Sequence, residues 1–250
     1  MASDYALIAE VYDRINGDVD YVRLAREYEK LFARYGSRPE ILLDLACGTG
    51  RLTGELAALG FDMIGVDGSP EMLMRAQERL AGRERVLLLC QQMEELDLYG
   101  TVDGAVCCLD GLNSLTEEGA LERALSKVSL FLVPGGIFIF DLNTRYKFER
   151  VLAQNSYIYD YDEFCCIWQN RYDVESGLCD FEMTYFLREA DGRYSRQDEL
   201  LRERMYPREE IDRALERTGF TLLGTYGNLR LAPAKENDER IYYIVQKRKD

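Results

Sequence analysis

The residues with the clearest chemical potential begin at Asp44, where one acid is followed by closely spaced glycines. Residues 41–50 read ILLDLACGTG, an apolar run that passes into a turn of small residues. The apolar run is typical of a short buried strand, and residues 51–59 have the spacing of an amphipathic helix. A glycine-containing turn between a strand and a helix lets backbone N–H groups approach a nucleotide-like ligand. The stretch therefore predicts a nucleotide-type site in an α/β protein.

A second acid, Asp67, ends the next apolar strand segment, 63–66, and lies seventeen residues beyond Gly50. An acid at this place suits hydrogen bonds to the two hydroxyl groups of a ribose. The glycine spacing departs from the dinucleotide fingerprint G-x-G-x-x-G, because Thr53 stands where the third glycine would be. Arg51 also closes the turn that a pyrophosphate would need open. The spacing therefore argues against a dinucleotide.

Residues 41–50 together with 65–73, which read GVDGSPEML, resemble the class I S-adenosylmethionine (SAM)-dependent methyltransferases. That family usually opens with acid-x-G-x-G-x-G, and here Ala46 takes the place of the first glycine. The resemblance implies SAM as cofactor and S-adenosylhomocysteine (SAH) as product. It also implies a set of cofactor-binding residues, which are Asp44, Ala46, Cys47, Gly48, Gly50, Asp67, Gly68, Met72, Gln92, Met93, Leu109 and Tyr12.

Some of these residues have specific roles by the same resemblance. Asp67 is expected to hold the ribose, and Asp44 to position the turn or, through water, the amino-acid end of the cofactor. Family members often have an acid at the position of Gln92, where it accepts a hydrogen bond from the adenine amino group. An amide oxygen can accept the same bond. Met93 would supply its backbone N–H, whereas Met72 is equally compatible with the core.

The candidates for the reaction itself follow two later strand segments. Asp110 and Asn113 come after the strand predicted at 102–109, at the edge where open α/β sheets place their ligands. This loop resembles the family segment beside the transferred methyl group, so Asp110 could orient or deprotonate a nucleophile. Turn formation is an equally open interpretation of these residue types. Candidate substrate contacts are Asn143 and Arg145, after the strand at 137–141, and Tyr5, in an N-terminal segment that resembles the family's cap.

Strands that alternate with helices predict a mostly parallel, doubly wound α/β sheet. The expected strands are 41–45, 63–66, 86–90, 102–109, 137–141, 221–226 and 241–245. The expected helices are 19–35, 51–59, one beginning at Ser69-Pro70, 116–132, and one beginning near 207. The resemblance implies a Rossmann-like sheet of seven strands with the last strand antiparallel. We assign 1–145 and 207–250 to the methyltransferase domain, with 1–36 as a helical N-terminal cap.

Residues 146–206 differ from the rest, because they combine β-rich runs with turn sequences. Apolar residues alternate over 181–187, Asp191-Gly192 is typical of a hairpin turn, and alternation resumes from 194. The segment predicts a small antiparallel sheet inserted after the fifth strand. Its position resembles the substrate lids of small-molecule methyltransferases, and a dimerisation surface is the alternative. Trp168 is interpreted as a packing residue rather than part of a cation cage.

The composition of the chain narrows the range of possible functions. The 250 residues include no histidine, and the seven cysteines form no Cys-x-x-Cys pair, so we expect no metal site and no Ser-His-Asp or Cys-His catalysis. A net charge of −14 repels nucleic acids. With no signal peptide and no apolar run long enough for a membrane, we expect a cytoplasmic protein, as a monomer or homodimer.

The leading hypothesis is a SAM-dependent methyltransferase that acts on a small-molecule acceptor, with an amine as one candidate. Methyl transfer needs chiefly in-line placement of the nucleophile, and an amine that arrives neutral needs no general base, which suits a chain without histidine. Two alternatives stay open. One is an NAD-dependent oxidoreductase on a similar sheet, and the other is a non-catalytic SAM-binding interaction protein.

Overall fold

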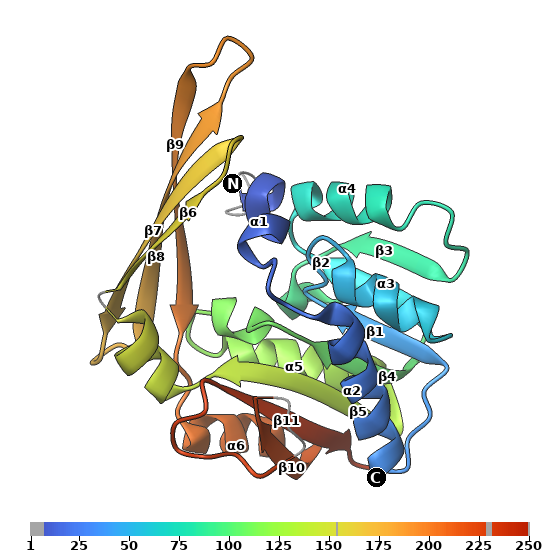
Figure 1. Cartoon of the computed structure of the whole chain (residues 1–250). Coiled ribbons are helices and arrows are strands. Elements are labelled where there is room, and N and C mark those ends of the chain that lie inside the picture. The colour runs from blue at the N-terminus through green and yellow to red at the C-terminus, as the bar shows by residue number, and fades with distance from the viewer. Residues whose placement is uncertain (1–7, 154, 229–231, 250) are drawn as a thin grey trace.

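The computed structural model describes residues 8–153, 155–228 and 232–249. In this part of the chain seven strands form one sheet in the order β3-β2-β1-β4-β5-β11-β10 (Figure 1). The strands are β1 (Ile41–Leu45), β2 (Asp62–Asp67), β3 (Val86–Cys90), β4 (Val102–Cys107), β5 (Leu132–Asn143), β10 (Phe220–Gly227) and β11 (Arg240–Lys247). β11 is antiparallel to both of its neighbours, whereas β1 to β5 pair in parallel. This arrangement confirms the expected Rossmann-like sheet and its antiparallel last strand.

Helices cover both faces of this sheet. They are α1 (Ile8–Ile15), α2 (Tyr21–Arg34), α3 (Arg51–Ala58), α4 (Pro70–Arg79), α5 (Ala120–Phe131) and α6 (Arg208–Arg217). Along β5, Ile137 and Ile139 pack with α2 and α3, whereas Phe138 and Phe140 pack with α5 and α6. Because alternate side chains of a strand point to opposite faces, the central strands are buried on both sides and read as nearly continuous apolar runs.

Four further strands form a separate antiparallel sheet in the order β6-β7-β8-β9. They are β6 (Ser156–Asp160), β7 (Phe164–Asp173), β8 (Leu178–Arg188) and β9 (Tyr194–Arg204), and a π-helical turn, Lys147–Leu152, precedes them. Figure 1 shows this sheet standing beside the edge toward which the arrowheads of β3 and β5 point. Its apolar face packs with Ala9 and Val11 of α1 and with Met72 of α4. The predicted antiparallel insertion is therefore confirmed, and it faces the carboxyl ends of the parallel strands.

Three local predictions need correction. The helix expected from 116 begins at Ala120, because Gly119 adopts a left-handed φ of 74° that interrupts the helical backbone before it. The strand expected to reach 109 ends at Cys107, because the φ of Leu109 is also positive. The strand expected at 137–141 is longer and starts at Leu132. In addition, β6 and the π-helical turn had no counterpart among the predicted elements. No helix in the described ranges combines the length and apolarity that a membrane crossing requires.

Candidate functional site

A cavity of about 470 Å³ lies between the carboxyl ends of the parallel strands, helix α1 and the antiparallel sheet. One side, here called the glycine-turn side, is formed by Ala46, Gly48, Asp67, Gly68 and Gln92. The opposite side, here called the charged side, is formed by Asp110, Lys147, Glu203 and Arg240. Residues of the insertion and of α1 cover the space between them, namely Tyr12, Ile15, Asn16, Trp168, Phe181, Met183 and Leu201.

Asp67 ties together the backbone of the glycine-turn side. Its carboxylate accepts hydrogen bonds from the backbone N–H of Gly48 at 2.8 Å and of Ser69 at 2.9 Å. Burial raises the pKa of this carboxyl, and the two N–H donors oppose that shift. Each carboxylate oxygen can accept more than one hydrogen bond, so Asp67 also has acceptor capacity for hydroxyl groups in the cavity.

The backbone of the glycine-turn side leaves room for a ligand to approach closely. Gly48 has a φ of 54°, and a Cβ built on it would meet no atom within 4 Å. At Gly68 the reason for glycine differs, since a Cβ there would lie 2.6 Å from Oε1 of Gln92. Gly48 thus leaves an open cradle at the cavity wall, and Gly68 lets the Gln92 amide pack against the chain after β2. The acceptor oxygens of Asp67, the Gln92 amide and the open backbone fit an adenosine-containing ligand.

Several predicted cofactor residues lie behind the cavity wall. Asp44 is fully buried and accepts a hydrogen bond from the Thr53 hydroxyl at 2.6 Å, which links β1 to α3. Burial raises the pKa of Asp44 to about 7, and its Oδ1 has no hydrogen-bond partner in the described part of the chain. Cys47 and Gly50 are also buried and do not line the cavity. By contrast, the predicted Tyr12, Ala46, Gly48, Asp67, Gly68, Met72, Gln92, Met93 and Leu109 all line it.

The charged side begins with an unusual backbone. Leu109 and Asp110 have φ values of 53° and 61°, although residues with a side chain seldom adopt this left-handed conformation. Their N–H groups both donate to the buried carboxylate of Asp141, at 2.9 and 2.8 Å. Arg240 forms a hydrogen-bonded ion pair with the same carboxylate. Asp141 therefore holds a strained turn in place, and such strain is concentrated at functional sites.

Asp110 lies at the centre of a hydrogen-bonded cluster. Its Oδ2 accepts a bond from Nδ2 of Asn143 at 2.6 Å and lies 3.3 Å from the guanidinium of Arg240. Lys147 donates to Oδ1 of Asn143 at 2.9 Å and lies 4.0 Å from Asp110. Burial alone would raise the pKa of Asp110, but Arg240 and Lys147 outweigh it and lower the pKa. Asp110 is thus a stable anion at the cavity wall.

The remaining predicted residues occupy different places. Asn113 is buried behind the charged side, where its Oδ1 accepts from the N–H of Asn143 at 2.9 Å and its Nδ2 donates to the carbonyl of Arg204 at 2.7 Å. It connects β5 to β9. Arg145 pairs with Glu149 at 3.1 Å and does not line the cavity. Tyr5 lies outside the described residues.

Sequence reasoning missed Glu203, Lys147 and Arg240, which come from β9, the turn after β5, and β11. Glu203 carries one sequence signal, because it falls two residues from Leu201 on one side and Met205 on the other. Side chains two apart in a strand share a face. Leu201 and Met205 are both buried, so the pattern places a carboxylate among apolar residues.

A methyltransferase-domain family model matches residues 42–136 of the chain. The solved structure of an S-adenosylmethionine-dependent methyltransferase from Clostridium acetobutylicum ATCC 824 is 32% identical, with a TM-score of 0.87 over 98% of this chain and 99% of that one. The chain belongs to the class I SAM-dependent methyltransferases. Among curated relatives of this methyltransferase is YqeM of Bacillus subtilis (strain 168), which is named as a methyltransferase and is 29% identical over 98% of both chains. A glycine/sarcosine N-methyltransferase of Parasynechococcus marenigrum (strain WH8102) is 31% identical over 51% of this chain and 44% of its own length.

Family membership establishes SAM as the cofactor of this methyltransferase, and it favours methyl transfer over the oxidoreductase hypothesis. When bound, SAM supplies a methyl group on a positively charged sulfonium, which is an effective leaving group. The part of the chain that the structure describes contains no cluster of three or more His, Cys, Asp or Glu side chains suited to a metal ion.

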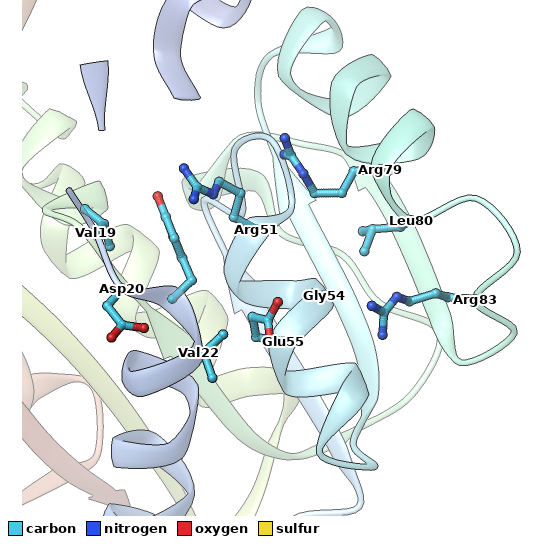
Figure 2. Close-up of a pocket in the computed structure, with 10 residues that line it drawn as sticks. Val19, Asp20, Val22, Arg51, Gly54, Glu55, Arg79, Leu80 and Arg83 are labelled. Carbon is cyan, nitrogen blue, oxygen red and sulfur yellow. The ribbon is translucent and has the colours of Figure 1, made fainter. Parts of the chain in front are cut away.

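A second cavity of the methyltransferase, of about 280 Å³, lies among α2, α3 and α4 (Figure 2). Figure 2 shows Arg51 and Arg79 near the start of α3, with Arg83 farther from that start, beyond Leu80. Arg51 lies over the ring of Tyr21, 4.4 Å from its centroid, and donates to the carbonyl of Asp13 at 3.3 Å. Arg79 forms an ion pair with the Asp13 carboxylate. Arg51 and Arg79 hold the N-terminal segment on the core, so we assign this cavity a structural role.

Asp13 also fastens α1 directly to the glycine turn. Its Oδ1 accepts a hydrogen bond from the Thr49 hydroxyl at 2.7 Å. On the other side of the helix, Arg14 pairs with Glu163 of the insertion at 2.6 Å, and its carbonyl accepts from the Tyr161 hydroxyl at 3.3 Å. Helix α1 therefore bridges the core and the insertion over the cavity.

Proposed function

We propose that this methyltransferase transfers the methyl group of SAM to the nitrogen of a small-molecule amine. The observation that carries the proposal is the charged side of the cavity, where Asp110 presents a stable carboxylate, beside the other charged residues, to a space that the insertion covers with apolar side chains. A carboxylate in such a place attracts an ammonium group and aligns the nitrogen that derives from it.

The insertion, residues 146–206, contributes most of the apolar cover as Trp168, Phe181, Met183 and Leu201. In the proposal this face receives the carbon body of the acceptor, while the glycine-turn side holds the cofactor through Asp67. The enclosed shape and the net charge of −14 both favour a small cationic or neutral acceptor over a polyanion. The name of the glycine/sarcosine N-methyltransferase relative supports nitrogen as the accepting atom.

Within this proposal Asp110 orients the acceptor, and Asn143 orients Asp110 through the 2.6 Å hydrogen bond. Asn113 acts one step farther away, because it fixes the backbone of Asn143. Placing the two reactants together supplies most of the rate enhancement that a methyl transfer needs. Arg145, directed to Glu149, is expected to contribute little.

The test is SAH release with three matched acceptors, benzylamine, benzyl alcohol and benzyl mercaptan, followed by a panel that includes glycine, ethanolamine and glucosamine. Release with amines, confirmed by mass spectrometry of the N-methylated product, is the expected result. SAH release with alcohols or thiols alone would show that the accepting atom is oxygen or sulfur instead of nitrogen. Tight SAM binding without transfer to any acceptor would support the non-catalytic alternative.

A further inference from the structure

We propose that Glu203 is a catalytic residue that accepts a proton from the ammonium group of the acceptor, and this inference rests on the amine methylation proposed above. Glu203 is supplied by the insertion, on β9, and its side chain lines the charged side of the cavity. The core and the insertion would then each contribute one carboxylate to the acceptor.

The first support is geometric. Nδ2 of Asn143 donates to Oδ2 of Asp110 at 2.6 Å and to Oε2 of Glu203 at 2.9 Å. One amide thus holds two carboxylates side by side at the cavity wall, within reach of a single ammonium group. Within the described ranges this amide is the only hydrogen-bond donor to Glu203, which leaves its other oxygen available to a ligand. Asp110, in contrast, also has Arg240 and Lys147 beside it.

The second support is the balance of charge. The cluster contains three carboxylates, those of Asp110, Asp141 and Glu203. It contains two cations, Arg240 and Lys147. Arg240 lies against both aspartates and Lys147 lies 4.0 Å from Asp110, whereas neither cation forms an ion pair with Glu203 among the described residues. Ionised Glu203 is therefore the excess negative charge, which either a proton or a ligand cation can balance. Cys179, opposite Glu203 on β8, does not change this count, because burial raises the pKa of its thiol to about 12.

The two carboxylates differ in the way this chemistry requires. Burial and repulsion from Asp110 raise the pKa of Glu203 to about 8, whereas Arg240 and Lys147 outweigh burial and lower the pKa of Asp110. A proton acceptor works best when its pKa lies near the working pH. Asp110 therefore stays ionised and holds the ammonium, and Glu203 takes its proton.

The step is a simple proton transfer followed by substitution. The N–H bond of the ammonium breaks, its proton moves to the Glu203 carboxylate, and its electron pair stays on nitrogen as a lone pair. That lone pair forms the new N–C bond while the methyl–sulfur bond breaks and its electrons remain on sulfur, which gives SAH and a methylated ammonium. The proton on Glu203 leaves to solvent after product release, so charge and atoms balance without a further reactant.

The experiment compares Glu203→Gln with the wild type and with Asp198→Asn, which replaces a carboxylate on the exposed face of the same strand. An alkyl amine with a pKa near 10.4 is neutral in roughly one molecule per thousand at pH 7.4. We expect Glu203→Gln to lower kcat/KM by about 100-fold at pH 7.4, within the usual range for a general base. The deficit should shrink steadily toward pH 10, where the amine deprotonates unaided, and Asp198→Asn should follow the wild type.

A second measurement needs no acceptor turnover. In protein labelled with ¹³C at glutamate carboxyls, the Glu203 signal, assigned by its loss in Glu203→Gln, should titrate well above the other glutamates. Methylammonium should lower that midpoint, and methanol should leave it unchanged. An ordinary midpoint, or one that methylammonium does not move, would overturn the proposal.

The outcomes separate this inference from the proposed function. If the wild type methylates amines and Glu203→Gln matches it at every pH, the proton-acceptor role is wrong while amine methylation stands. If the wild type methylates only alcohols or thiols, both are wrong. If no acceptor reacts, the proposed function fails, and the response of the Glu203 signal to methylammonium decides whether the ammonium site exists.

Discussion

The glycine-turn side and the charged side of the cavity are assembled differently. The first comes from turns between Ala46 and Met93, each directly after a parallel strand, and it uses backbone N–H groups and one carboxylate. The second combines residues from Asp110 to Arg240, on two sheets, and it uses four ionisable side chains, with the buried Asp141 behind them. Under the proposed function, the core binds the cofactor, and the acceptor is recognised by charges of the core to which the insertion adds Lys147 and Glu203.

The strongest test of this division is Asp67→Ala. Charge-assisted hydrogen bonds contribute about 1.5–3 kcal/mol each, so losing two to the ribose should weaken SAM binding by more than about 100-fold. Titration calorimetry with SAM and SAH measures the loss. Asp62→Ala is the matched control, because it removes a carboxylate from the opposite end of β2, where Asp62 pairs with exposed Arg85. Equal affinity of both variants would remove Asp67 from the cofactor site.

The next largest effect is expected for Asp141→Asn, on the charged side. Asparagine leaves Arg240 with Asp110 as its one remaining carboxylate partner in the described residues and weakens the hold on the strained Leu109-Asp110 turn. Breaking one side of a buried ion pair should cost about 3 kcal/mol, and so lower Tm by roughly 6–12 °C.

Asp103→Asn provides the control for that variant. Asp103 also accepts two consecutive backbone N–H groups, from Glu40 and Ile41 at 2.9 and 2.8 Å, but at the other edge of the sheet and without a buried arginine. The Tm of Asp103→Asn should change far less than that of Asp141→Asn, and both variants should keep near-native SAM affinity. A large loss of SAM affinity in Asp141→Asn would show that the two sides of the cavity are coupled.

A smaller effect is expected where α1 joins the glycine turn to the insertion. Asp13→Ala removes the bond from Thr49 and the ion pair with Arg79, each worth about 1 kcal/mol or less at a partly exposed site. We expect about a tenfold weaker binding of SAM, mainly through faster dissociation. Stopped-flow displacement measures that rate, with exposed Asp18 changed to alanine as control. Unchanged dissociation in Asp13→Ala would mean that α1 does not retain the cofactor.

The contrast between the two sides also explains how much the sequence predicts. The succession of strands and helices along residues 41–107 and the Ser69 cap, whose hydroxyl accepts from the N–H of Met72 at 3.2 Å, depend on neighbouring residues and on a short motif. Residues 46–50 and 67–68 are predictable for the same reason, because a turn after a parallel strand carries its own geometry. The predicted start of α5 at Thr116 was wrong. The left-handed backbone of Gly119 interrupts the helix there, so α5 begins at Ala120 although Thr116 is a suitable capping residue.

On the charged side, Asp110 has such a local signal, because it follows a predicted strand, but the residues that surround it do not. Arg240 reaches Asp110 within the core sheet, because β11 pairs with β5, whereas Glu203 on β9 meets Asp110 only through the packing of the insertion on the core. Charge in the sequence predicts solvent exposure by default, since paired burial depends on a partner far away in the chain. The alternation of apolar residues around Glu203 predicts which face of the strand carries its side chain, but it does not predict which residues that face contacts.

The smallest effect concerns the backbone of the glycine-turn side, through Ala46→Gly. Ala46 holds a φ of 59°, which costs a residue with a Cβ about 1–2 kcal/mol, whereas glycine loses about 0.4–1 kcal/mol more entropy on folding. We expect stabilisation by less than about 1 kcal/mol in urea unfolding, with SAM affinity within about twofold of wild type. The same change at Ala57, in the last turn of α3, should destabilise by up to about 1 kcal/mol. If both variants lose stability alike, the turn is not strained at Ala46, and the shape of this side must be held by contacts such as those of Asp67 instead of by its local conformation.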